Sequence, residues 1–168
     1  MEQAVLAAEA GCMYIAPFVH ELKAFFDETY HDDGPILGHC LRIQQYYERH
    51  SYKTRVKAAG LLNVDEAMRL AGVTSLTLAP ALIDTLSKSE ESEEKVMNLS
   101  LFKQETNSTE DEIERLSFLD DENKFRKTFA KSEGGKGQSK TAQAIDIFRE
   151  YQIKAESLMR DYDSTRIG

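Results

Sequence analysis

Residues 54–70 read TRVKAAGLLNVDEAMRL, a short strand-like run followed directly by a helical pattern. We predict a strand over Thr54–Leu61. Asn63 is suited to cap a helix that continues through Leu70, because its side chain can accept a backbone hydrogen bond and the residues after it are acidic. This stretch therefore predicts one strand–helix unit.

Similar units are predicted on both sides of this stretch. Upstream, Glu2–Glu9 has a helical pattern, and the continuous apolar run Cys12–Pro17 is typical of a buried parallel strand. A further helix with an apolar face ends near His50. Downstream, Ser75–Ala79 predicts a third strand, and Pro80 stands where the first turn of a helix tolerates proline. This alternation of strands and helices indicates an α/β fold with a parallel sheet.

The chain changes character after residue 88. We predict that residues 89–140 form an acidic and Gly/Ser-rich variable region, with a possible helix within Glu110–Ala130 and a flexible linker over Ser132–Ser139. Residues 141–161 are predicted to form an amphipathic helix. Its apolar residues recur at helical spacing, and they are Ile145, Phe148, Tyr151, Ala155 and Leu158.

Composition and charge narrow the classes of partner. The 168 residues are 41% hydrophobic and 30% charged, with a net charge of -8 and a pI near 5.1. This negative field argues against binding to nucleic acid or to anionic membranes. Because no signal-like or membrane-spanning run is evident, we expect a cytoplasmic protein in which Cys12 and Cys40 are both reduced.

Three segments carry a resemblance to a known family. They are Glu9–Gly11 leading into Ile15–Val19, Ile43–Tyr47 followed by His50, Tyr52 and Thr54, and Leu76–Leu82. In this order and spacing they resemble strands six, seven and eight of the transaldolase family, with the helix between six and seven. The resemblance covers about half of the chain, residues 1–88, and extends more loosely to the terminal helix. It implies a partial (βα)8 TIM barrel with three parallel strands and a C-terminal helical extension.

The family's chemistry follows from the same resemblance. Transaldolases of the pentose phosphate pathway transfer a dihydroxyacetone unit between sugar phosphates through a lysine Schiff base, without a metal or an organic cofactor. The resemblance places the lysine on strand four and the acids on strands one and three, all upstream of Met1. We therefore assign no catalytic residue, no cofactor and no metal.

Two phosphate-binding positions of the family depart from its pattern. The family's Ser-Pro-Phe-Val-Gly-Arg is here Ala16–Glu21, and its Ser-Phe-Arg-Asn is here Gly60–Asn63. The resemblance thus implies substrate positions at Ala16, Phe18 and Asn63, while Glu21 and Leu62 replace arginines. A carboxylate repels phosphate, so we expect no binding of sugar phosphates.

Several side chains have a functional and a structural interpretation. Lys57 is a speculative replacement nucleophile, but we favour a lysine at the end of a strand or on an edge strand, which reaches solvent or discourages edge pairing. We favour a core role for Phe18 over a place at the active-site mouth, and helix packing with one surface hydroxyl for Tyr46 and Tyr47. A solvated polar loop is favoured over a metal site for a group of potential ligands, which are His31, Asp32, Asp33, His39 and Cys40.

These observations predict a catalytically inactive transaldolase-like fragment or accessory protein. The alternatives are the C-terminal part of a split enzyme, which docks onto a complementary barrel half, and a non-catalytic binding module. Three strands leave two open edges, and we expect an exposed apolar inner face. The residues expected on that face are Ile15, Val56, Ala58, Leu76 and Leu78. We therefore expect self-association, docking of a complementary half, cover by the terminal helix, or a partly molten chain.

Overall fold

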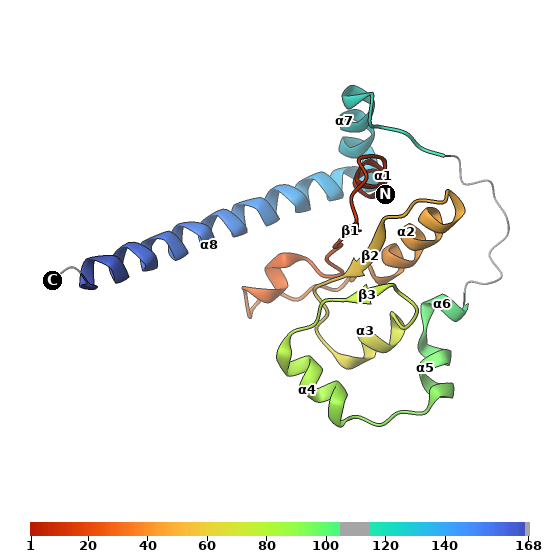
Figure 1. Cartoon of the computed structure of the whole chain (residues 1–168), viewed down its shortest axis with the longest axis horizontal. Helices are drawn as coiled ribbons and strands as arrows, with labels where there is room; N and C mark the ends of the chain where they lie inside the picture. Colours follow the sequence, from red (N-terminus) through yellow and green to blue (C-terminus); the bar gives the residue numbers. More distant parts are fainter. Residues whose placement is uncertain (105–114, 167–168) are drawn as a thin grey trace.

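The computed structural model describes residues 1–104 and 115–166, and its centre is a small parallel sheet flanked by helices (Figure 1). In chain order the elements are α1 (Glu2–Glu9), β1 (Tyr14–Ile15), the 3-10 turn η1 (Leu22–Phe25), α2 (Leu37–Arg49), β2 (Arg55–Ala58), α3 (Val64–Arg69), β3 (Ser75–Leu76), α4 (Pro80–Lys88), α5 (Glu93–Leu99), α6 (Leu101–Gln104), α7 (Glu122–Lys131), the 3-10 turn η2 (Ser132–Gly135) and α8 (Lys136–Arg166). The predicted α/β fold is confirmed.

The sheet has the order β1-β2-β3, and both of its pairings are parallel. Tyr14 is in register with Arg55, and Lys57 is in register with Ser75. Each strand occupies only part of its predicted run, because the paired segments are short. β2 is the central strand, so Lys57 does not lie on an edge strand, which was one of the two structural interpretations; it lies next to the last residue of β2.

Two predicted helices, α3 and α4, begin where the capping residue or proline in the sequence indicates. The side chain of Asn63 accepts a hydrogen bond from the backbone N–H of Glu66 at 3.0 Å, which confirms the predicted cap of α3. Pro80 is the first residue of α4, where its missing N–H costs no helical hydrogen bond. The strand–helix unit that the sequence predicts over residues 54–70 is therefore present.

The apolar face of the sheet lies against the helices. Val56 and Ala58 are fully buried in a core that includes residues of α1 and α2. Register places Ile15 and Leu76 on the same face as these two residues. The expected apolar inner face is therefore wrong: these residues point toward the helices, and the opposite face of the sheet is polar.

Tyr46 and Tyr47 connect α2 with distant segments. The Tyr47 hydroxyl donates to the carbonyl of Ala4 at 2.6 Å, and the Tyr46 hydroxyl accepts from the N–H of Leu116 at 2.9 Å. Both side chains are buried. The predicted surface hydroxyl is therefore wrong, because each hydroxyl has a backbone partner inside the molecule.

The segment that we predicted as a linker is structured. Residues 132–135 form a turn in which Glu133 and Gly134 have positive φ, and α8 begins at Lys136 instead of the predicted Thr141. Glycine favours this left-handed conformation, so it serves a tight turn between α7 and α8. Part of the predicted helical segment Glu110–Ala130 lies outside the described residues, and α7 begins at Glu122. None of the described helices is both long enough and apolar enough to cross a membrane.

Candidate substrate face at the carboxyl ends of the strands

The predicted substrate positions all follow the carboxyl ends of β1 and β2. Parallel strands end at the same edge of a sheet, and ligands of α/β folds bind at that edge. Phe18 pairs with Ala59 through an isolated parallel bridge, so the segments after the two strands lie side by side. Ala16 and Asn63 are exposed, as is Leu62. The structure therefore brings these residues to one edge of the sheet.

Phe18 does not fill the core, contrary to the interpretation that we favoured. Its side chain is 43% exposed, and its ring centroid lies 6.5 Å from that of Phe148 on α8. Gly60 has a φ of +74°, and an added Cβ there would lie 2.9 Å from the Phe18 ring. A larger residue at position 60 would therefore meet both a strained backbone and a steric conflict.

Glu21 carries a stable negative charge at one expected phosphate position. Its carboxylate accepts hydrogen bonds from the Tyr30 hydroxyl and from the Lys140 ammonium on α8. Burial acts to raise the pKa of Glu21, but these two hydrogen bonds and the positive charge of Lys140 together lower the pKa overall. The hydrogen bond between the Tyr30 hydroxyl and Glu21 raises the pKa of Tyr30 to about 12. The position thus offers an anion that is already paired.

His20, beside Glu21, is buried between two carboxylates. Its Nδ1 lies 3.1 Å from Asp32 Oδ2, and its Nε2 lies 2.9 Å from Glu66 Oε1. Carboxylates only accept hydrogen bonds, so both nitrogens can donate only when the imidazole is protonated. Because both nitrogens are occupied, His20 holds the surrounding loops together and offers no atom to a substrate.

Sequence reasoning did not single out this bridge. Its only local signal is the spacing of Asn63 and Glu66, which matches a capping box. Glu66 Oε2 accepts from the N–H of Leu62 at 2.8 Å, so the same carboxylate orders the start of α3 and holds His20. The contact with Asp32 depends on tertiary structure.

α8 passes over this edge of the sheet. In addition to the Lys140–Glu21 ion pair, Tyr151 lies 4.5 Å from Phe26, measured between ring centroids. Figure 1 shows that the helix then extends away from the rest of the structure. The first half of α8 is therefore part of the candidate site, whereas residues 152–162 further along the helix are exposed.

Lys57 lies on the face of the sheet opposite the core. Its Nζ is 4.7 Å from the centre of the Tyr14 ring, and Arg55 lies 3.5 Å from the Tyr14 hydroxyl. Among the described residues, no carboxylate lies within ion-pair distance of Lys57. Within the described residues, Lys57 therefore makes a cation–π contact and has no neighbouring acid.

The potential metal ligands of the sequence are separated in the structure. Asp32 turns inward to His20, whereas His31 and Asp33 are exposed. His39 and Cys40 belong to α2. Burial, followed by the N-terminal ammonium and Arg42, lowers the pKa of His39 to about 4, and burial raises the pKa of Cys40 to about 11. In residues 1–104 and 115–166, no three potential ligands converge on one point.

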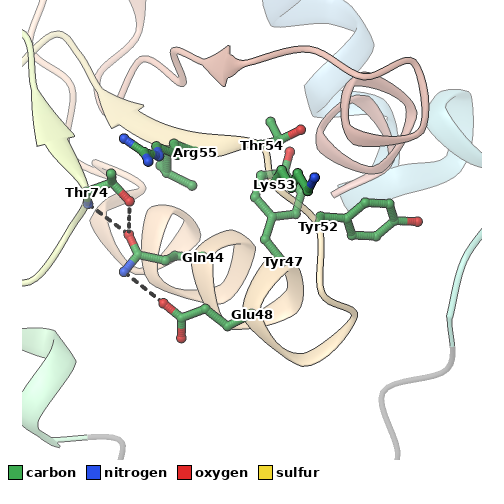
Figure 2. Close-up of a pocket in the computed structure, with 9 residues that line it drawn as sticks. Gln44, Tyr47, Glu48, Tyr52, Lys53, Thr54, Arg55 and Thr74 are labelled. Atoms are coloured by element: carbon green, nitrogen blue, oxygen red, sulfur yellow. Dashed lines mark hydrogen bonds between the residues drawn. The ribbon is translucent and has the colours of Figure 1, made fainter.

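A separate pocket of about 410 Å³ lies at the opposite edge of the sheet, near the amino end of β2 (Figure 2). Gln44 is one of the residues that line it. The Gln44 Oε1 atom accepts from the N–H of Thr74 at 2.9 Å, and its Nε2 donates to Glu48 at 3.2 Å. These hydrogen bonds connect α2 to the segment that leads into β3, so Gln44 contributes to the packing of α2 against the sheet.

Comparison with known proteins gives a consistent family. The family described as transaldolase/fructose-6-phosphate aldolase matches residues 1–136. A transaldolase of Kluyveromyces lactis is 38% identical over 151 residues, which are 87% of this chain and 43% of the relative. Transaldolase NQM1 of Saccharomyces cerevisiae is 32% identical, covering 94% and 46% of the two chains. A probable transaldolase of Drosophila melanogaster is 33% identical, covering 95% and 47%. The chain thus spans less than half the length of these relatives.

Proposed function

Because the chain belongs to the transaldolase/fructose-6-phosphate aldolase family and forms part of its TIM barrel, we propose that it is a transaldolase-like accessory protein that catalyses no aldol transfer alone. The chemistry needs an amine nucleophile together with acids that transfer protons. A cytoplasmic location is part of the proposal and rests on the family resemblance.

Glu21 is the observation that carries this proposal. A sugar phosphate needs cationic donors at its phosphate end, and bidentate arginine is well suited to that role. Where the resemblance expects an arginine, the chain has a carboxylate that is held by Lys140 and Tyr30. The other expected arginine is Leu62, an exposed apolar residue. Both differences disfavour a bound phosphate.

The surroundings of Lys57 support the same proposal. A Schiff-base lysine works with nearby carboxylates that move protons during the reaction. Lys57 instead lies over the Tyr14 ring, and the described part of the chain places no acid within ion-pair distance of it. The speculative role of Lys57 as a nucleophile therefore gains no support from its neighbours.

The test is reductive trapping. The purified chain is incubated with fructose 6-phosphate and sodium borohydride, and its mass is then measured, with the Kluyveromyces lactis transaldolase as the positive control. We expect the mass of the chain to stay unchanged. A stoichiometric adduct would contradict the proposal, and its loss in Lys57→Ala would identify Lys57 as the nucleophile.

A second candidate is one part of a split enzyme. The sheet has two outer edges without a partner strand in the described residues, and the relatives are more than twice as long as the matched segment. A missing barrel half could supply both strands and catalytic groups. Restoration of turnover when such a half is added would favour this candidate over an accessory role.

A further inference from the structure

The face of the sheet away from the core is cationic. Register places Tyr14 beside Arg55 and Lys57 beside Ser75, and alternation along β2 directs Arg55 and Lys57 away from the buried Val56 and Ala58. Both cations interact with Tyr14. We call Tyr14, Arg55, Lys57 and Ser75 the open face.

Polar groups of the open face lack a counter-charge or a hydrogen-bond partner among the described residues. No carboxylate of residues 1–104 and 115–166 lies within ion-pair distance of either Arg55 or Lys57, although the chain as a whole has a net charge of -8. The hydroxyl of Ser75 is buried and has no hydrogen-bond partner among the described residues. These groups would fit a surface that is completed by another chain segment.

The sheet edges indicate the shape of such a segment. β1 and β3 each pair with one strand only in the described residues, which leaves their outer backbone groups available for strand pairing. A segment that covered the open face would exclude water from Arg55 and Lys57. Buried cations are strongly unfavourable unless they gain counter-charges, so the segment must also be acidic.

We propose that the open face is a docking surface for a strand-forming protein segment whose carboxylates pair with Arg55 and Lys57. A second copy in face-to-face contact is disfavoured, because it would bring four like charges together. The relatives leave room for such a segment, since this chain covers only 43% of the Kluyveromyces lactis transaldolase. The surface does not depend on whether the resulting assembly is catalytic, so this proposal and the proposed lack of activity can fail separately.

The experiment uses the full chain and three synthetic peptides of alternating sequence. A glutamate–valine peptide is the probe, and glutamine–valine and lysine–valine peptides of equal length are its controls. We expect the glutamate peptide to bind at least about tenfold more tightly than the glutamine peptide, with affinity that falls as salt rises. Hydrogen exchange should map the protection to the sheet, at the outer edge of either β1 or β3.

Variants connect this affinity to the open face. The double variant R55E/K57E should lose the preference for the glutamate peptide and bind the lysine peptide instead, while Lys88→Glu on the exposed surface of α4 should bind as the unmodified chain does. The neutral variant R55Q/K57Q serves if charge reversal prevents folding, as judged by circular dichroism. Equal affinity for the glutamate and glutamine peptides, or protection elsewhere, would overturn the proposal.

Discussion

His20 shows how one residue connects three segments at the candidate site. Its ring joins the loop after β1 to Asp32 and to Glu66 at the start of α3. Burial acts to raise the pKa of Asp32, but hydrogen bonds from the backbone of Glu21 and Gly34 and from His20 lower it overall. A carboxyl group with a lowered pKa in the folded state stabilises the fold only while it is ionised.

We predict that the folded protein loses the stabilisation provided by Asp32 in acid. The stabilisation by Asp32 should be complete above its ordinary pKa of 3.8 and should disappear as the pH falls through its lower folded pKa. Asp32→Asn should lower the free energy of unfolding by about 1.5–3 kcal/mol at pH 7. The difference from the unmodified chain should shrink below about pH 4, as measured by urea denaturation.

The neighbouring aspartate provides the control. Asp33 is 92% exposed in its side chain and makes a long contact of 3.8 Å with His31. Asp33→Asn should therefore leave both the stability at pH 7 and its pH dependence nearly unchanged. If the free energy of unfolding depended on pH in the same way in both variants, the contact between His20 and Asp32 would not contribute to the loss of stability in acid.

At the scale of the elements, α8 is held mainly near its start. Lys140, Phe148 and Tyr151 contact the segment between β1 and α2. Further along the helix, Leu158 is 72% exposed. The amphipathic pattern that predicts this helix therefore finds an apolar partner for only part of its length.

We predict that aromatic contacts hold the first half of α8 against the segment between β1 and α2. Phe148→Ala should increase hydrogen exchange in the first half of α8, because it removes the contact with Phe18. Lys140→Ala should have a smaller effect, with less than about 1 kcal/mol lost, because its ion pair with Glu21 is partly exposed. Arg149→Ala, an exposed change on the same helix, should leave exchange unaltered. Equal exchange in all three variants would show that these contacts do not hold α8.

At the scale of the whole molecule, charge opposes phosphate binding. The net charge is -8, and Glu21 adds a local anion at the carboxyl edge of the sheet. The two cations of the open face lie on β2, whereas the expected phosphate positions follow the strand ends. The net negative charge and the local Glu21 carboxylate therefore both disfavour the binding of a phosphate group.

We predict that the unmodified chain has negligible affinity for fructose 6-phosphate and sulfate. Calorimetry should detect no binding at micromolar concentration for the unmodified chain, because neither expected arginine is present. The double variant E21R/L62R should gain phosphate affinity without gaining turnover, since it adds donors but no nucleophile. Arg126→Lys on α7 is a suitable control. Micromolar binding by the unmodified chain would contradict the prediction.

The sequence by itself determined the local elements. Asn63 and Pro80 specify helix starts through groups within a few residues of them, and the short apolar runs specify three strands in a parallel order. The same local logic failed for the glycines near residue 134, because composition does not distinguish a flexible linker from a tight turn.

Only the tertiary structure decided which face of each strand is buried and which side chains meet. Alternation separates Val56 and Ala58 from Arg55 and Lys57, but the helices select which pair enters the core. Likewise, His20 meets Glu66 across 46 residues, and Glu21 meets Lys140 across 119. Such contacts depend on the path of the whole backbone, which no local pattern of residues specifies.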